Sequence, residues 1–245
     1  MGQINSTNLE IYYLYNSGFS VVLENRDALI FDYYRGSLGR PWRTPLPAEP
    51  AGYRGVYVFA SHQHGDHYNA EIFSWRAERP DISYILSDDI RIAADPRGIT
   101  TIAEGGEAQV GDIHVRAYGS TDLGVSFHVL AGGLSIFHAG DFNYWHWTDE
   151  SSAAEIAEAR RGFNRVLASV KEGIPKIDVA FFPVDPRIGS DYYRGAVLFC
   201  EAMRPTLLVP MHFSQKFAPP RAFYDEITRY TKVVPVGPAA GRLIM

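Results

Sequence analysis

The chain reads Ser61-His62-Gln63-His64-Gly65-Asp66-His67 directly after a run of buried-type strand residues at 56–60. His62 and His64 are two residues apart, so an extended backbone points both imidazoles to the same side. Gly65 permits a sharp reversal, which lets Asp66 and His67 turn back toward the same pocket. Such a donor set suits borderline divalent metals, zinc first, with manganese or iron as alternatives. The other interpretation is a solvated, histidine-rich loop, and the preceding strand and the spacing argue against it.

Two later segments place metal-ligand residues just past the end of an apolar run. The run 134–137 is followed by His138-Ala139-Gly140-Asp141, and the run 206–209 by Pro210-Met211-His212. Because α/β sheets commonly place their sites at the carboxyl ends of strands, we expect Asp141 and His212 beside the first cluster. Asp141 can bridge two metals with its two oxygens. For His212 taken alone, a buried core histidine is the alternative.

The composition limits the class of protein. The 245 residues include 23 lysines and arginines against 28 aspartates and glutamates, a net charge of −5 that argues against a nucleic-acid partner. The single cysteine, Cys200, excludes thiolate-built zinc sites and intramolecular disulfides. The first ten residues do not resemble a signal peptide, and no apolar run approaches the ~18 residues of a membrane helix. We therefore expect a cytoplasmic protein without a membrane partner.

Strand-like runs dominate the first half of the chain, and strands alternate with helices in the second half. This order favours one domain over residues 1–245, built from mixed α and β layers. The Gly- and Pro-rich stretch 35–53 is typical of a long loop of the kind that often forms a lid. Strands are expected at 11–15, 19–24, 28–33, 56–60, 84–86, 113–118, 125–130, 134–138, 179–182 and 206–209. Helices are expected at about 69–79, from a cap at Ser151 or Ser152 to 170, at 189–203 and at 219–230.

The sequence resembles a known family in the order and spacing of these motifs. The block His62-x-His64-x-Asp66-His67, the pair Gly140-Asp141 and the final His212 resemble the metallo-β-lactamase-fold hydrolases. Asn16–Phe19 and Ile30–Asp32 resemble that family's first strands. The stretches 119–122 and 137–147 resemble small bacterial members that are distant relatives of the ascorbate-phosphate lactonases. The resemblance implies an α/β (α+β) fold, a four-layer αββα sandwich with the metals at one edge between the sheets.

The resemblance also implies roles for these residues. His62 and His64 would hold a first metal, and Asp66, His67 and His212 a second, with Asp141 bridging the two. A metal-bound water, its pKa lowered toward ~7, would be the nucleophile. Asp66 would be the catalytic residue that orients this water and passes a proton to the leaving group. The implied activity is metal-dependent hydrolysis of a small ester, lactone or phosphodiester-like substrate.

One expected ligand is missing. The family usually supplies a third histidine to the first metal from the strand end that here reads Ala117-Tyr118-Gly119-Ser120-Thr121. Asp122 or His146 can substitute, the first metal can be weak or absent, or it can bind only with substrate. An aromatic packing role is the alternative for His146. The chain is thus expected to bind one or two divalent ions. The missing histidine also supports a second hypothesis, a non-catalytic member that binds metal or ligand, and a nuclease is a third.

Few residues indicate the substrate, which is expected to be a small molecule and can be anionic. Arg187 or Lys216 can hold a phosphate or carboxylate, and Asp185 is expected at the same edge as Arg187. The aromatic residues Trp42, Tyr144, Trp145 and Trp147 can wall a pocket for a ring or acyl chain. The alternatives are an Asp185–Arg187 pair that braces its loop and aromatic residues that only pack. Three further histidines are expected outside the metal site: His138 as an orienting or structural residue, and His114 and His128 as partly exposed strand residues.

Overall fold

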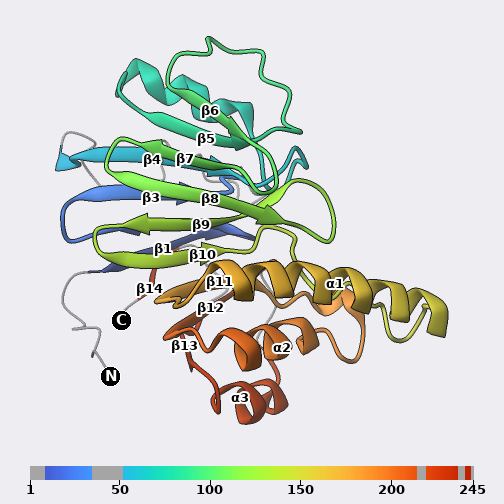
Figure 1. Ribbon diagram of the computed structural model, residues 1–245. Helices are drawn as coiled ribbons and strands as arrows, with labels where there is room; N and C mark the ends of the chain where they lie inside the picture. The colour runs from blue at the N-terminus through green and yellow to red at the C-terminus, as the bar shows by residue number, and fades with distance from the viewer. Residues whose placement is uncertain (1–8, 35–51, 214–218, 237–240, 244–245) are drawn as a thin grey trace.

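The computed structural model describes residues 9–34, 52–213, 219–236 and 241–243. Within these ranges, fourteen strands form two seven-stranded sheets, in the order β14-β1-β2-β3-β4-β5-β6 and β13-β12-β11-β10-β9-β8-β7 (Figure 1). Most of the predicted lid at 35–53 lies outside the described residues, which resume at residue 52. Two candidate substrate residues, Trp42 and Lys216, also lie outside them.

The first sheet changes from antiparallel to parallel pairing at its centre. Strands β14, β1, β2 and β3 pair antiparallel, whereas β3, β4, β5 and β6 pair parallel. The parallel register sets Phe31 beside Phe59, so the residues that follow β3 and β4 emerge at the same edge. The strands are β1 (Glu10–Tyr15), β2 (Gly18–Val22), β3 (Asp27–Phe31), β4 (Gly55–Ala60), β5 (Ser83–Ser87), β6 (Ile99–Ile102) and β14 (Gly241–Leu243).

The second sheet has the same two-part construction. Strands β7 to β10 form an antiparallel meander, and β10 to β13 are parallel. The carboxyl ends of β10, β11 and β12 therefore also meet at one edge. The strands are β7 (Glu107–Val110), β8 (Ile113–Gly119), β9 (Val125–Ala131), β10 (Leu134–His138), β11 (Val179–Pro183), β12 (Leu207–Met211) and β13 (Lys232–Val233).

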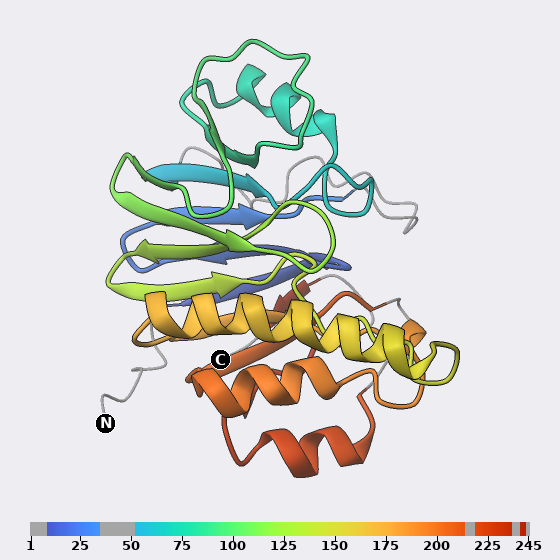
Figure 2. The same ribbon diagram turned by 45° about the vertical axis from the view of Figure 1, so that its right-hand side comes forward.

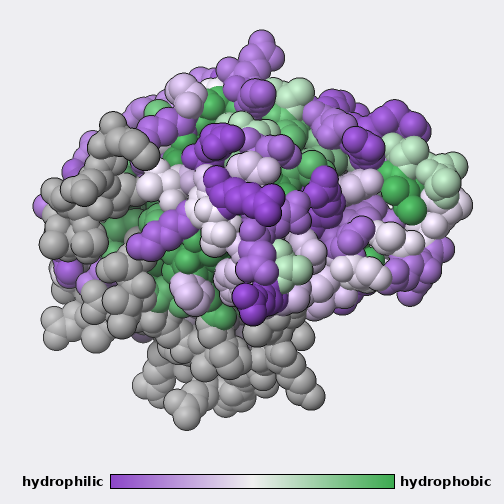
Figure 3. All heavy atoms as spheres, turned by 90° about the horizontal axis from the view of Figure 1, so that it is seen from below, coloured by the Kyte–Doolittle hydropathy of each residue, from purple (hydrophilic) through white to green (hydrophobic). Residues whose placement is uncertain are grey.

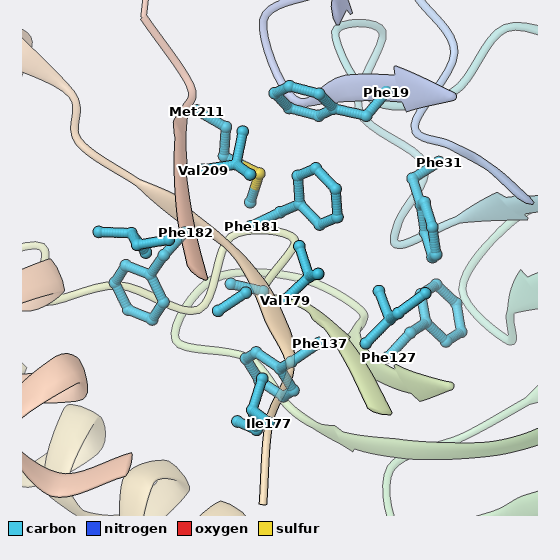
Figure 4. Close-up of a cluster of buried hydrophobic side chains, with 14 of the residues drawn as sticks. Phe19, Phe31, Phe127, Phe137, Ile177, Val179, Phe181, Phe182, Val209 and Met211 are labelled. Carbon is cyan, nitrogen blue, oxygen red and sulfur yellow. The ribbon is translucent and has the colours of Figure 1, made fainter. Parts of the chain in front are cut away.

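Aromatic side chains fill the space between the two sheets. Phe19 on β2 packs on Phe181 of β11 with ring centroids 4.6 Å apart, and Figure 4 shows Phe31 and Phe127 in the same layer. The next residue, Phe182, points to the other side of β11 and stacks on Phe199 of α2 at 4.6 Å. Alternation along the strand thus explains why β11 is apolar throughout: one face meets the other sheet and the other meets helices.

Helices cover the outer face of the second sheet. These are α1 (Ala153–Gly173), α2 (Arg194–Met203) and α3 (Arg221–Ile227), drawn in yellow to red in Figures 1 and 2. The longest of them, α1, is capped by Ser152, one of the two caps expected from the sequence, and the Ser152 side chain forms a capping box with Glu155. Seen from the side on which α3 lies, hydrophilic side chains cover most of the centre of the surface (Figure 3).

The outer face of the first sheet carries a thinner layer. It is covered by η2 (Ala70–Ala77), a 3-10 helix whose buried Ile72 and Trp75 pack in one cluster with Val58 and Tyr84. The four layers confirm the predicted αββα sandwich. The helix expected at about 69–79 is present as the 3-10 helix η2. Two helix boundaries were wrong: α2 begins at Arg194 rather than 189, and α3 is shorter at both ends than the expected 219–230. Among the described residues, no helix is both long and apolar enough to cross a bilayer.

Candidate metal centre

The candidate ligands meet at the edge where four strands end. Ser61 and His62 directly follow β4, Asp141 follows β10 after a short turn, and His212 directly follows β12. A fourth segment, the loop between β8 and β9, contributes Asp122. Residues from distant parts of the sequence therefore reach one place because the sheets align their strand ends.

The first group of ligand atoms comes from His62, His64, Asp122 and Asp141, which all lie within 4.8 Å of one another. His62 Nε2 lies 3.0 Å from His64 Nδ1 and 3.6 Å from Asp141 Oδ2. His64 Nδ1 lies 3.5 Å from Asp122 Oδ2. Two imidazoles and two carboxylates thus surround one position, which is a donor set that divalent transition metals accept.

The second group comes from Asp66, His67 and His212, whose ligand atoms also lie within 4.8 Å of one another. Asp66 Oδ2 is 3.8 Å from the Nε2 atoms of both histidines. Asp141 joins this group through its other oxygen, because Oδ1 lies 3.1 Å from His67 Nε2 and 3.2 Å from His212 Nε2. Asp141 therefore presents one oxygen to each group, as a bridging carboxylate does.

Unpaired buried atoms show that these residues fit a metal ion. His67 Nε2, His212 Nε2 and Asp141 Oδ1 are buried, and although the two nitrogens lie 3.1 and 3.2 Å from this oxygen, none of the three atoms forms a well-aligned hydrogen bond among the described residues. A buried polar atom without a partner costs about 1–3 kcal/mol, so native proteins rarely leave three of them together. A divalent cation at the second group would satisfy all three atoms at once.

Two buried carboxylates orient the histidines of the second group. Asp32 Oδ2 lies 2.7 Å from His67 Nδ1, and Asp185 Oδ2 lies 2.9 Å from His212 Nδ1. A proton on each Nδ1 is donated to the carboxylate, which leaves the Nε2 lone pair directed at the candidate metal position. Asp32 also accepts hydrogen bonds from the backbone and hydroxyl of Ser61, at 2.8 and 2.7 Å.

The electrostatics of the pocket favour a bound cation. Burial opposes the charged form of His67 and His212, but the neighbouring Asp141 carboxylate outweighs it, so the pKa of His67 rises well above 6.5 and that of His212 rises to about 9. Burial likewise tends to raise the pKa of Asp141, yet His212 and His67 hold it well below its usual value. A divalent ion can replace the imidazole protons as the counter-charge to these carboxylates.

Close backbone packing places Asp122 beside His64. Gly124 has a φ of +66°, and a Cβ there would lie 2.0 Å from the carbonyl oxygen of Ser61 and 2.5 Å from His62 Cβ. The next residue, Val125, donates its N–H to the same Ser61 oxygen at 2.9 Å. The loop before β9 therefore lies directly against the histidine-rich segment, and only glycine permits this approach.

The two candidate substitutes for the missing histidine differ in position. Asp122 lies in the first group, whereas His146 is buried away from it, with Nδ1 2.6 Å from the carbonyl oxygen of Tyr144 and its ring stacked on Tyr144 at 4.3 Å. His146 therefore has the aromatic packing role that was its alternative.

The remaining histidines lie outside both groups. His138 is structural: its Nε2 donates to the carbonyl oxygen of Ser17 at 2.9 Å, and its ring stacks on Phe31. His114 is partly exposed, as expected. The expectation was wrong for His128, which is only 7% exposed because it lies between β8 and β10 and hydrogen-bonds Ser135.

An open cavity of about 440 Å³ adjoins both groups, within the usual range for small-molecule sites. Trp145 and Arg187, two of the candidate substrate residues, line it, as does Trp147. Asp185 does not, because it is 1% exposed and bonds both His212 and Arg187. Asp185 lies at the same edge as Arg187, as expected, but it lies behind His212 and forms the Asp185–Arg187 pair that was the alternative to a substrate-binding role. The whole lining consists of His64, Asp66, Thr121, Asp122, Asp141, Trp145, Trp147, Arg187 and His212.

Sequence reasoning missed two residues that support the site. In the sequence, Asp32 is recognised only as part of a strand that resembles the family. It directly follows the buried strand β3, however, and a position just past an apolar run is the signal that identified Asp141. Asn16 donates its side-chain N–H to Asp66 Oδ2 at 3.2 Å, and its carbonyl oxygen accepts the N–H of His212 at 3.1 Å. Nothing local to Asn16 predicts either contact.

Comparisons with known proteins agree with this fold. No protein-family model matches the chain. A curated relative named UPF0173 metal-dependent hydrolase, from Staphylothermus marinus, is 28% identical in an alignment that covers 93% of this chain and 96% of the relative. The structure of Igni18, a metallo hydrolase from Ignicoccus hospitalis, superposes with a TM-score of 0.64 at 18% identity. The match covers 98% of this chain and 100% of the Igni18 chain. The structure of YhfI, a metallo-β-lactamase-fold protein from Bacillus subtilis, superposes with a TM-score of 0.59 at 12% identity. The match covers 96% of this chain and 98% of the YhfI chain.

The αββα sandwich, with paired His/Asp groups at its strand ends, is the fold of the metallo-β-lactamase-fold protein YhfI. The chain is similar over nearly its whole length to the proteins named UPF0173 metal-dependent hydrolase, at 28% identity.

Proposed function

We propose that the chain binds two divalent ions and hydrolyses a small ester, lactone or phosphodiester-like substrate. The observation that carries this proposal is Asp141, which directs Oδ2 toward His62 in the first group and Oδ1 toward His67 and His212 in the second. Zinc suits the histidines, and manganese or iron are alternatives because each group also contains carboxylates.

The chain's own residues would prepare the reaction. When bound, the ions would supply Lewis-acid polarisation of the scissile group and lower the pKa of a water nucleophile. Asp66 faces the cavity and is held by Asn16, so its carboxylate can orient the attacking water and pass its proton to the leaving group. Asp32 and Asp185 keep His67 and His212 in the tautomer that binds metal.

Two alternatives have less support. A non-catalytic member would be favoured by an incomplete first group, but Asp122 supplies a fourth donor there. A nuclease would be favoured by a basic channel, yet the described cavity lining contains three aspartates and a single arginine, and the whole chain carries a charge of −5.

The test is hydrolysis of chromogenic esters, lactones and phosphodiesters by metal-loaded protein. Wild type is expected to hydrolyse at least one class, and His64→Ala to lose about 100-fold or more of that rate because a ligand of the first ion is gone. His114→Ala is the matched control, since this partly exposed histidine lies outside both groups. Equal rates for wild type and His64→Ala would show that the assigned site is not the catalyst.

A further inference from the structure

We propose that the cavity selects a substrate carrying an anionic group, which binds Arg187, next to a flat apolar group, which stacks on Trp145 and Trp147. Phosphate, phosphonate and carboxylate are the anions that a guanidinium recognises best. This inference rests on the proposed hydrolase function, because it assigns the substrate class of the same site.

Arg187 is held in place to receive an anion. Its Nε lies 2.8 Å and its Nη2 2.5 Å from Asp185 Oδ2, so one edge of the guanidinium is fixed by a buried carboxylate. Its Nη1 has no hydrogen-bond partner among the described residues, and the side chain is 70% exposed. Arg187 is also the only lysine or arginine among the described residues that line the cavity. Because the guanidinium is already held in place and has an unused donor, little side-chain reorganisation is needed when an anion binds.

The Asp185 contact also ties Arg187 to the metal centre. Asp185 Oδ2 contacts both Arg187 Nη2 and His212 Nδ1, so this carboxylate connects the guanidinium to His212, a candidate metal ligand. Arg187 Nη2 itself is 3.4 Å from His212 Nδ1. An anionic group on Arg187 would therefore lie close to the reacting bond, and a small substrate can span the two.

The two tryptophans offer a flat surface on the same cavity. Their rings stack with centroids 5.6 Å apart and planes inclined by 26°. Trp145 is fixed by donating Nε1–H to the carbonyl oxygen of Asp141 at 2.9 Å, and its ring meets His212 edge-on at 5.5 Å. The flat surface is therefore anchored beside the metal ligands.

Trp147 has two features that suit a ligand-binding position. Its side chain is 38% exposed, one of three large exposed apolar side chains among the described residues. Its backbone φ is +36°, in the left-handed region, where a bulky residue costs about 1–3 kcal/mol. Such strain is typical of functional positions, and an exposed indole at a cavity is suited to stacking on a flat ligand group.

The test is calorimetric titration of metal-loaded protein with methylphosphonate and phenylphosphonate, which share the anion and differ in the ring. Wild type is expected to bind phenylphosphonate about 2- to 13-fold more tightly, since an aromatic contact contributes about 0.5–1.5 kcal/mol. Trp147→Ala should reduce that preference and leave the affinity for methylphosphonate unchanged. Arg187→Met should weaken both ligands about 10- to 100-fold, the loss expected for a charged hydrogen bond, and Arg187→Lys should fall between it and wild type.

Controls separate these effects from general damage. Arg165→Met removes an exposed cation on α1, and Leu130→Ala removes an exposed apolar side chain on β9, both outside the cavity lining. Affinities are compared at equal metal content, measured for each variant, because phosphonates also bind metal ions directly.

Two results would overturn the inference: wild-type affinity for both phosphonates in Arg187→Met, or an undiminished ring preference in Trp147→Ala. Binding needs no turnover, so these failures differ from failure of the proposed function, which is the absence of hydrolysis with any substrate class.

Discussion

Asp185 offers a sharp test of how the second metal group is organised. Its Oδ2 accepts from His212 Nδ1 at 2.9 Å, and both of its oxygens face donors on Arg187. Asp185→Asn keeps the shape of the side chain but replaces one oxygen with an NH2 group. If that NH2 faces His212, it donates to Nδ1, which favours the tautomer with its proton on Nε2. Nε2 is the atom that should bind metal, so the substitution opposes ligation.

The expected loss follows from these contacts. Asp185 is 1% exposed, so water cannot replace the lost carboxylate oxygen. A hydrogen bond to a charged group is worth about 1.5–3 kcal/mol, and changes to such supporting residues typically cost about 10–100-fold in metal affinity. We expect this loss for the ion at Asp66, His67 and His212, and little change for the ion at His62, His64 and Asp122.

Metal affinity can be measured by titrating metal-free protein with zinc or manganese in the calorimeter. The variant is expected to show one site of wild-type affinity and one weakened site. Asp27→Asn serves as the matched control, because Asp27 is also a buried aspartate paired with an arginine, but it lies at the start of β3 and outside both groups. Two sites of unchanged affinity in Asp185→Asn would refute the orienting role.

Three other changes have defined outcomes. Asp122→Asn should lower the bound metal from two equivalents toward one, measured by elemental analysis; two retained equivalents would exclude Asp122 as a ligand. Gly124→Ala should destabilise the protein by at least ~2 kcal/mol in urea, because a Cβ would lie 2.0 Å from the Ser61 oxygen at a left-handed φ. Burial lowers the pKa of His128 from 6.5 to about 4. As the pH falls from 6.5 toward 4, His128 is therefore protonated in the unfolded chain while it stays neutral in the folded protein. The free energy of unfolding should thus drop by about 2 kcal/mol between about pH 7.5 and 5. His128→Gln should remove this part of the pH dependence, and the same pH dependence in wild type and variant would contradict the prediction.

The local pattern of the sequence predicts the centre of the site but not its surroundings. The spacing of His62, His64, Asp66 and His67 needs only a strand and a turn, and Asp141 and His212 follow buried runs that any parallel arrangement brings to one edge. The position of Asp122 beside His64 depends on Gly124 packing against Ser61, a contact between residues distant in sequence.

The supporting carboxylates and the edge strands depend on long-range pairing in the same way. Asp32 reaches His67 only because β3 and β4 pair in parallel, and no local pattern shows which strands are neighbours. The short strands β7 and β13 are partly exposed at the sheet edge, so their residues lack the apolar run by which buried strands are found. The β11 segment is found because it is buried on both faces.

The most direct test of the metal centre is anomalous X-ray diffraction from crystals of the metal-loaded protein. We expect two anomalous peaks, one on each side of the Asp141 carboxylate: the first among His62, His64 and Asp122, the second among Asp66, His67 and His212. A single peak at the second group would mean that Asp122 does not complete the first. The absence of any peak beside Asp141 would contradict the metal centre itself.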